Sequence, residues 1–149
     1  MKFKFTSLLV LIIAVLCAGC LKNSSPATPN ALNVPSGNFT GQFQLIRQHT
    51  ATKKYDTTYA NCRLVLNPDM SFILTGDTTT VMAAGQGTFG LDQSSGLMFF
   101  TDQTAPKNYT LNSPKKHLTG TFLYNYSGVN LTIGGASDTL SLVYTLIRN

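Results

Sequence analysis

From residue 38 onward the sequence predicts an all-β fold, an eight-stranded antiparallel up-and-down barrel, for three reasons. The chain contains no Glu, and this segment is rich in Thr, Phe, Tyr, Val and Leu, which favour strands. Apolar and polar residues alternate over short runs that Gly, Pro, Asn and Asp separate. The connections are mostly short, and eight such strands can close into a barrel without free edges. A two-sheet β-sandwich is the alternative architecture.

The strands are expected at residues 39–45, 57–67, 71–75, 81–91, 96–101, 118–126, 129–133 and 139–147. In the first strand, Phe39, Phe43 and Leu45 share one face, as residues two or four apart in a strand do. The second strand ends at the turn sequence Asn67-Pro68-Asp69. The second and third strands should therefore form a hairpin.

The fourth and fifth strands are predicted from apolar residues and glycines. Phe89 and Leu91 are in phase in the fourth strand, and Gly85 and Gly87 mark bends in it. The fifth strand contains a continuous apolar run over residues 97–100. A run of this kind is typical of a strand that is buried on both faces.

The last three strands are separated by turn formers. Phe122 and Tyr124 belong to the inward set of the sixth strand, and Gly128 marks the turn that follows it. Residues 134–135, both Gly, and 137–138 mark the turn before the closing strand.

The residues predicted to face inward form a core in the simplest interpretation. They are Phe43, Leu45, Leu64, Leu66, Phe72, Leu74, Phe89, Phe99, Phe122, Tyr124, Tyr126, Leu142 and Tyr144. A ligand pocket is the sharper hypothesis, because eight strands permit a filled interior or one small ligand. A buried phenol needs a hydrogen-bond partner, which favours the tyrosines as ligand contacts. The candidate ligand-binding residues are Tyr124, Tyr126, Tyr144, Phe43, Phe89 and Phe122.

The N-terminus has the three parts of a secretory signal. Lys2 and Lys4 supply positive charge, residues 8–16 form an apolar run, and the small residues at 18–19 precede Cys20. The apolar run is shorter than the roughly 20 residues of a membrane-spanning helix. The segment resembles the signal of bacterial lipoproteins. That resemblance implies cleavage before Cys20, a diacylglyceryl thioether on its sulfur and a fatty acyl chain such as palmitate on its amine.

The chain is therefore expected to have three parts: a lipoprotein signal peptide over residues 1–19, a lipidated Cys20 with a flexible linker over 20–37, and one domain over 38–149. Cys17 departs from the lipoprotein pattern, which usually has Leu at that position. In that family an Asp after the cysteine favours the inner membrane, so Leu21 implies the outer membrane. Whether the domain faces the periplasm or the cell surface stays open.

The domain resembles the lipocalin-like group of small bacterial lipoproteins over residues 37–149. Lipocalins begin with Gly-x-Trp and place an Arg from the last strand over the Trp ring; Gly37-Asn38-Phe39 and Arg148 occupy these places here. The chain has no Trp, so Phe39 would replace the covered ring. The resemblance implies that the barrel binds a small apolar or amphipathic molecule. A solid barrel that serves as an interaction or structural module is the alternative.

Composition argues against several other functions. Without residues 1–19 the net charge falls from +5 to about +3, and the basic residues are scattered, unlike a nucleic-acid footprint. His49 and His117 lie in expected loops and are interpreted as solvated, and Cys62 is in phase with a buried face. The turn-forming Asp residues are expected to cap local backbone groups. We therefore expect no enzyme activity, no cofactor, no metal site and no nucleic-acid partner, and we expect a monomer.

Overall fold

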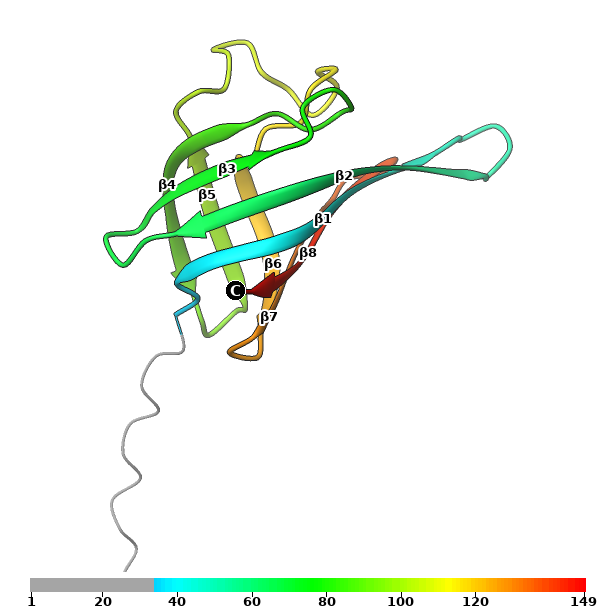
Figure 1. The fold of residues 1–149 in the computed structure, drawn as a ribbon. Helices are drawn as coiled ribbons and strands as arrows, with labels where there is room; N and C mark the ends of the chain where they lie inside the picture. Colours follow the sequence, from blue (N-terminus) through cyan, green and yellow to red (C-terminus); the bar gives the residue numbers. More distant parts are fainter. Residues whose placement is uncertain (1–33) are drawn as a thin grey trace, which may run out of the picture. The chain divides into compact units, whose positions relative to one another are not determined.

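A computed structural model describes residues 34–149, which form a closed barrel of antiparallel strands in sequence order (Figure 1). The strands are β1 (Gly37–Gln48), β2 (Tyr55–Leu66), β3 (Ser71–Gly76), β4 (Gly85–Asp92), β5 (Leu97–Asp102), β6 (Gly120–Tyr126), β7 (Asn130–Ala136) and β8 (Leu140–Arg148). Pairing of β1 with β8 closes the barrel. The eight-stranded up-and-down barrel is confirmed, and the sandwich is excluded. None of the described residues belongs to a helix long and apolar enough to span a membrane.

The interior of the barrel is filled by alternate side chains of its strands. Ala60, Cys62 and Leu64 of β2 are buried, whereas Asn61 and Arg63 between them are exposed. Burying a side chain the size of Leu or Phe contributes about 1.5–3 kcal/mol. The buried hydrophobic residues form one core cluster, to which every strand contributes. The core is therefore the main source of the barrel's stability.

The inward set follows the prediction except in β5. Phe99 is 42% exposed, whereas Met98 and Phe100 on either side of it are buried. The register explains the phase, because Phe100 lies opposite Phe89 of β4 and Met98 lies opposite Phe122 of β6. The prediction that β5 is buried on both faces is wrong. A continuous apolar run carries no alternation from which the inward phase can be chosen.

Some strand boundaries differ from the expected ones. β4 begins at Gly85 instead of residue 81, because Met82 forms an isolated bridge with Lys116 of the connection that follows β5 and belongs to no barrel strand. β7 continues through the two glycines that were predicted to form a turn. A Cβ atom at Gly135 would lie 2.8 Å from the Phe122 ring, so the glycine makes room for that ring inside the barrel.

The domain begins slightly earlier than expected, because Gly37 is the first residue of β1 and pairs with Leu66. Pro35, placed in the linker by the sequence, is buried. The predicted signal peptide, Cys20 and the linker up to residue 33 lie outside the described residues.

Candidate functional site

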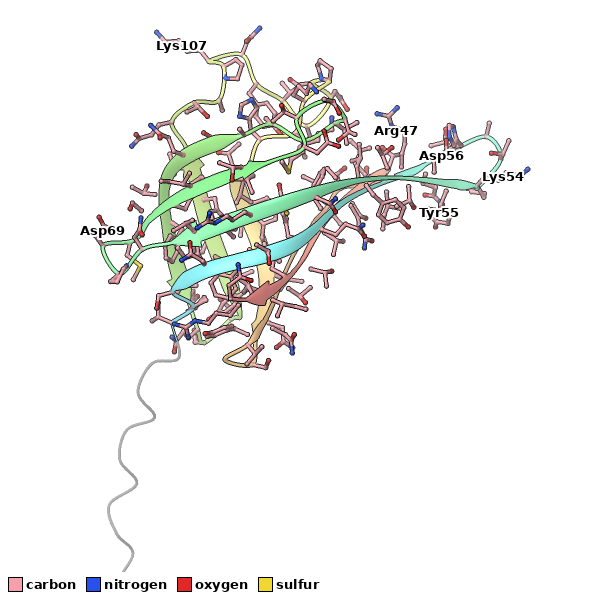
Figure 2. The ribbon with its side chains drawn as sticks, viewed as in Figure 1. Arg47, Lys54, Tyr55, Asp56, Asp69 and Lys107 are labelled. Carbon is pink, nitrogen blue, oxygen red and sulfur yellow. The ribbon has the colours of Figure 1, made fainter. Side chains whose placement is uncertain are left out.

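The two ends of the barrel differ in their connections. β1 begins and β8 ends at one end, which we call the entry end. The opposite end, which we call the distal end, carries the connections 49–54, 77–84, 103–119 and 137–139. The longest of these, residues 103–119, extends above the barrel in Figure 1, and Lys107 points away from the barrel at its tip in Figure 2.

A gap opens between β6 and β7 at the distal end. The ladder between these strands ends where Leu123 pairs with Gly134. β6 nevertheless starts at Gly120 and β7 runs to Ala136. Residues 120–122 of β6 and 135–136 of β7 therefore do not pair with each other. The barrel wall is therefore incomplete at this place.

A pocket of about 320 Å³ occupies this gap. Its walls come from the start of β6, the end of β7, the start of β8 and the 103–119 connection. The lining residues are Tyr109, Thr110, Leu111, Thr119, Gly120, Thr121, Phe122, Gly135, Ala136, Ser137, Leu140 and Leu142. This volume is at the lower end of the roughly 300–1,000 Å³ range of small-molecule sites. The lining combines apolar residues with Thr and Ser, a combination that suits a small amphipathic molecule.

A buried polar cluster lies beside the pocket. The Asp102 carboxylate has no exposed surface, and its Oδ2 atom is 2.9 Å from Nδ1 of His117. Its Oδ1 atom accepts hydrogen bonds from the backbone N–H (2.8 Å) and hydroxyl (2.5 Å) of Thr104. The Tyr109 ring, which lines the pocket, packs edge-on against His117 at a centroid distance of 5.2 Å. Burial raises the pKa of Tyr109 above its usual value.

The glycines of β4 allow this cluster to form. A Cβ atom at Gly85 would lie 2.2 Å from Oδ2 of Asp102, and one at Gly87 would lie 1.9 Å from the carbonyl oxygen of Thr101. The sequence predicted bends at these glycines, and the structure shows that they permit close approach of β5. Any larger residue at position 85 would displace the Asp102 carboxylate.

Two lysines hold the 103–119 connection in place. Lys116 is 1% exposed, and its ammonium donates hydrogen bonds to the carbonyl oxygens of Leu111 (2.7 Å) and Ser113. Burial, with the positive charge of Arg47 as a second cause, lowers the pKa of Lys116 below its usual value. Lys115 donates to carbonyl oxygens in the neighbouring 77–84 connection. The connection beside the pocket is therefore held in place by hydrogen bonds from these lysines.

The middle of the barrel is occupied by aromatic side chains. The rings of Phe43 and Tyr144, both 0% exposed, lie 4.8 Å apart. The Tyr144 hydroxyl is buried and has no hydrogen-bond partner among the described residues. Burial raises the pKa of Tyr144. The interior thus contains one phenol whose hydrogen-bonding capacity is unused.

The structure separates the six candidate ligand-binding residues. Phe122 lines the pocket. Phe43, Phe89 and Tyr144 belong to the buried core, and Tyr124 and Tyr126 are partly buried against it. The pocket residues that sequence reasoning missed come from the 103–119 connection, from the β7–β8 turn and from the adjoining ends of β6, β7 and β8. The unusual length of that connection is the signal that points to it, because long ordered loops are often functional.

Arg148 and Phe39 lie at the entry end of the barrel, and that the guanidinium covers the Phe39 ring stays a prediction. They are directly opposite each other in the β1–β8 ladder. The Arg148 guanidinium lies near Gly37, where an added Cβ would be 3.2 Å from Nε, and Nη1 donates to the Tyr126 hydroxyl at 3.3 Å. Tyr126 packs edge-on against Phe39 at 6.0 Å. Arg148 therefore has a phenol oxygen as a partner beside the Phe39 ring.

The environments of the titratable residues match the expectations from the sequence in some cases and differ in others. Cys62 is buried, as expected, and its burial raises its pKa to about 11, which keeps the thiol protonated and unreactive. Local capping by Asp is confirmed at Asp69, Asp77, Asp92 and Asp102.

The interpretation of His117 as solvated is wrong, because its side chain is 11% exposed and contacts Asp102. His49 is half exposed and lies 2.5 Å from Asp56. Among residues 34–149, no group of three His, Cys, Asp or Glu is placed to hold a metal ion.

Comparisons of the chain with protein-family models, with curated proteins and with solved structures found no match.

Proposed function

We propose that this protein is a lipoprotein, anchored to the outer membrane through Cys20, whose lipocalin-like barrel binds a small apolar or amphipathic molecule without catalysing a reaction. The pocket between β6 and β7 is the observation that carries the binding proposal. It combines a volume of about 320 Å³ with apolar walls from Phe122, Leu140 and Leu142. The anchoring proposal rests on the signal-like residues before Cys20.

The polar groups at the pocket suggest how an amphipathic ligand would be oriented. Thr119, Thr121 and Ser137 are hydroxyl-bearing residues of the lining. Leu142, which also belongs to the lining, is buried. The apolar part of the ligand would contact the leucines and Phe122, and its polar part would lie near the Thr and Ser residues of the lining. Such a division is typical of small-molecule sites.

Binding can be tested with an apolar fluorescent probe, N-phenyl-1-naphthylamine, and protein that starts at residue 21. Leu111 lines the pocket and is 42% exposed, so Leu111→Ser removes an apolar contact with little cost to folding. We expect this change to weaken probe binding about threefold to tenfold, which is about 1 kcal/mol. Leu123→Ser is the matched control, because Leu123 is 65% exposed on β6 outside the pocket lining.

The second candidate function is an interaction module with a solid barrel. The filled interior around Phe43 and Tyr144 favours this alternative. Wild-type protein that fails to bind the probe and carries no co-purified small molecule in native mass spectrometry would support the module. Equal weakening by Leu111→Ser and Leu123→Ser would show that the probe binds outside the pocket.

A further inference from the structure

The β1–β2 hairpin extends beyond the rest of the barrel wall (Figure 1). β2 starts at Tyr55, but its ladder with β3 covers only Cys62 to Leu66. Residues 55–60 of β2 therefore pair with β1 on one side and with no described strand on the other. We call residues 55–60 the free edge. Figure 2 shows Tyr55 and Asp56 on the projecting part of the hairpin.

The direction of the backbone groups along the free edge follows from hydrogen bonds at its two ends. His49 N–H bonds to Lys54 O, so Lys54 faces β1. Asp77 N–H bonds to Asn61 O, so Asn61 faces away from β1. Because backbone groups alternate in an antiparallel ladder, Tyr55, Thr57 and Tyr59 direct their N–H and C=O groups away from β1. These groups have no backbone partner among residues 34–149.

Unpaired strand edges accept a further strand, and most proteins protect them with charge, proline or a covering element. This edge carries one charged residue, Asp56, whose carboxylate is 2.5 Å from His49. Tyr55 and Tyr59 are 64% and 52% exposed and lie on the same face of β2. The edge thus combines free backbone groups with two exposed aromatic rings.

We propose that the free edge pairs with the same edge of a second copy of this chain, in an antiparallel ladder with a two-fold axis at Thr57. In this register Thr57 lies opposite Thr57 of the second copy, and Tyr55 lies opposite Tyr59. It is the register in which all the outward-directed residues of the edge meet one another as hydrogen-bonded pairs. Aromatic and Thr–Thr pairs across strands each contribute roughly 0.2–1 kcal/mol. This proposal goes beyond ligand binding and replaces the expected monomer.

The charge distribution favours a second copy of this chain as the partner of the free edge. The two-fold register places Asp56 opposite Thr58, so no like charges face each other. It also brings Lys53 and Lys54 at the tip of one hairpin to the far end of the other copy's free edge. The exposed, acidic Asp77 lies at that end, where its backbone N–H donates to the Asn61 carbonyl oxygen. The lysines of one copy therefore lie near Asp77 of the other. Hydrogen bonds from Thr79 lower the pKa of Asp77 below its usual value, which favours its charged form.

Disulfide trapping tests the register in the full-length protein within its native envelope. Hydrogen-bonded residues that face each other have Cα atoms about 5.5 Å apart, within the range of a disulfide. Thr57→Cys should therefore give roughly tenfold more disulfide-linked dimer than Thr58→Cys, whose two copies would be offset along the strand to about 8 Å. Thr58 is the matched control because it is the adjacent exposed Thr. Wild-type protein corrects for the native cysteines.

A second variant tests association without cross-linking. Thr57→Pro removes an N–H that points away from β1, and proline is tolerated on edge strands. We expect the wild type to dimerise with rising concentration in sedimentation experiments, and Thr57→Pro to remain monomeric with an unchanged circular dichroism spectrum. Equal trapping of Thr57→Cys and Thr58→Cys, or a wild type that stays monomeric, would overturn the proposal. Trapping of Thr57→Cys to a different protein would also overturn it, in favour of another extended partner.

Discussion

At the scale of single residues, the environment of Cys62 determines its chemistry. The thiol is 5% exposed, in phase with the buried Ala60 and Leu64. Burial raises its pKa from 9.0 to about 11, so the thiol stays protonated at neutral pH. A thiol in this state is a small apolar core group and a poor nucleophile.

The raised pKa of Cys62 predicts a loss of stability at alkaline pH. The unfolded thiol ionises near pH 9 and the folded thiol near pH 11, so the contribution is complete below pH 9 and is lost as pH rises through 11. The free energy of unfolding, taken as wild type minus Cys62→Ala, should fall by about 2–3 kcal/mol over this range. Urea denaturation of both proteins at several pH values measures this difference in the free energy of unfolding. A difference that does not change with pH would contradict the prediction.

At the scale of elements, the 103–119 connection depends on buried polar contacts. Asp102 receives hydrogen bonds from Thr104 and contacts His117, so one carboxylate holds both ends of the connection. Lys116 holds the segment between them by donating to Leu111 and Ser113. These contacts position Leu111 and Tyr109 over the pocket.

Replacement of Asp102 should release this connection. Asp102→Ala removes a buried acceptor and leaves the Thr104 N–H and His117 without it, which costs about 3 kcal/mol. Amide hydrogen exchange over residues 103–119 should become faster while exchange in the middle of β1 stays slow. Asp92→Ala is the control, because Asp92 makes similar bonds to Ser94 and Ser95 in an exposed turn. Similar effects of both variants on the connection would contradict this role.

The strands were predictable to a greater extent than the site. Alternating residues such as Phe43 and Leu45 reveal both the strand and its inward face without tertiary information. Contacts between distant segments decide three features that the local sequence does not show. They are the outward direction of Phe99, the continuation of β7 through Gly135 and the burial of Lys116. The pocket has the same origin, because it exists where the β6–β7 ladder stops at Leu123. No local pattern encodes where a ladder ends.

At the scale of the whole domain, the entry end and the distal end differ in structure. Residue 37 begins β1 at the entry end, where Arg148, Tyr126 and Phe39 pack together. The pocket lies at the distal end, among the connections. β1 therefore begins at the end of the barrel opposite the proposed binding site.

The proposed anchor predicts a specific modification. Cells grown with labelled palmitate should incorporate label into the wild-type protein and not into Cys20→Ala, and the variant should leave the membrane fraction. The Cys62→Ala protein is the control, because its buried thiol is not the proposed acceptor. Label retained in Cys20→Ala, or a wild type without label, would contradict lipidation at this residue.

The central claim, that the gap between β6 and β7 is a ligand site, is tested most directly by locating a bound probe. Backbone amide shifts of the domain should be followed by nuclear magnetic resonance during titration with N-phenyl-1-naphthylamine. We expect the largest shifts in residues 109–111, 119–122 and 135–142, which surround the pocket. Shifts concentrated near Tyr126 and Arg148 at the entry end, or no saturable shifts at all, would contradict the account.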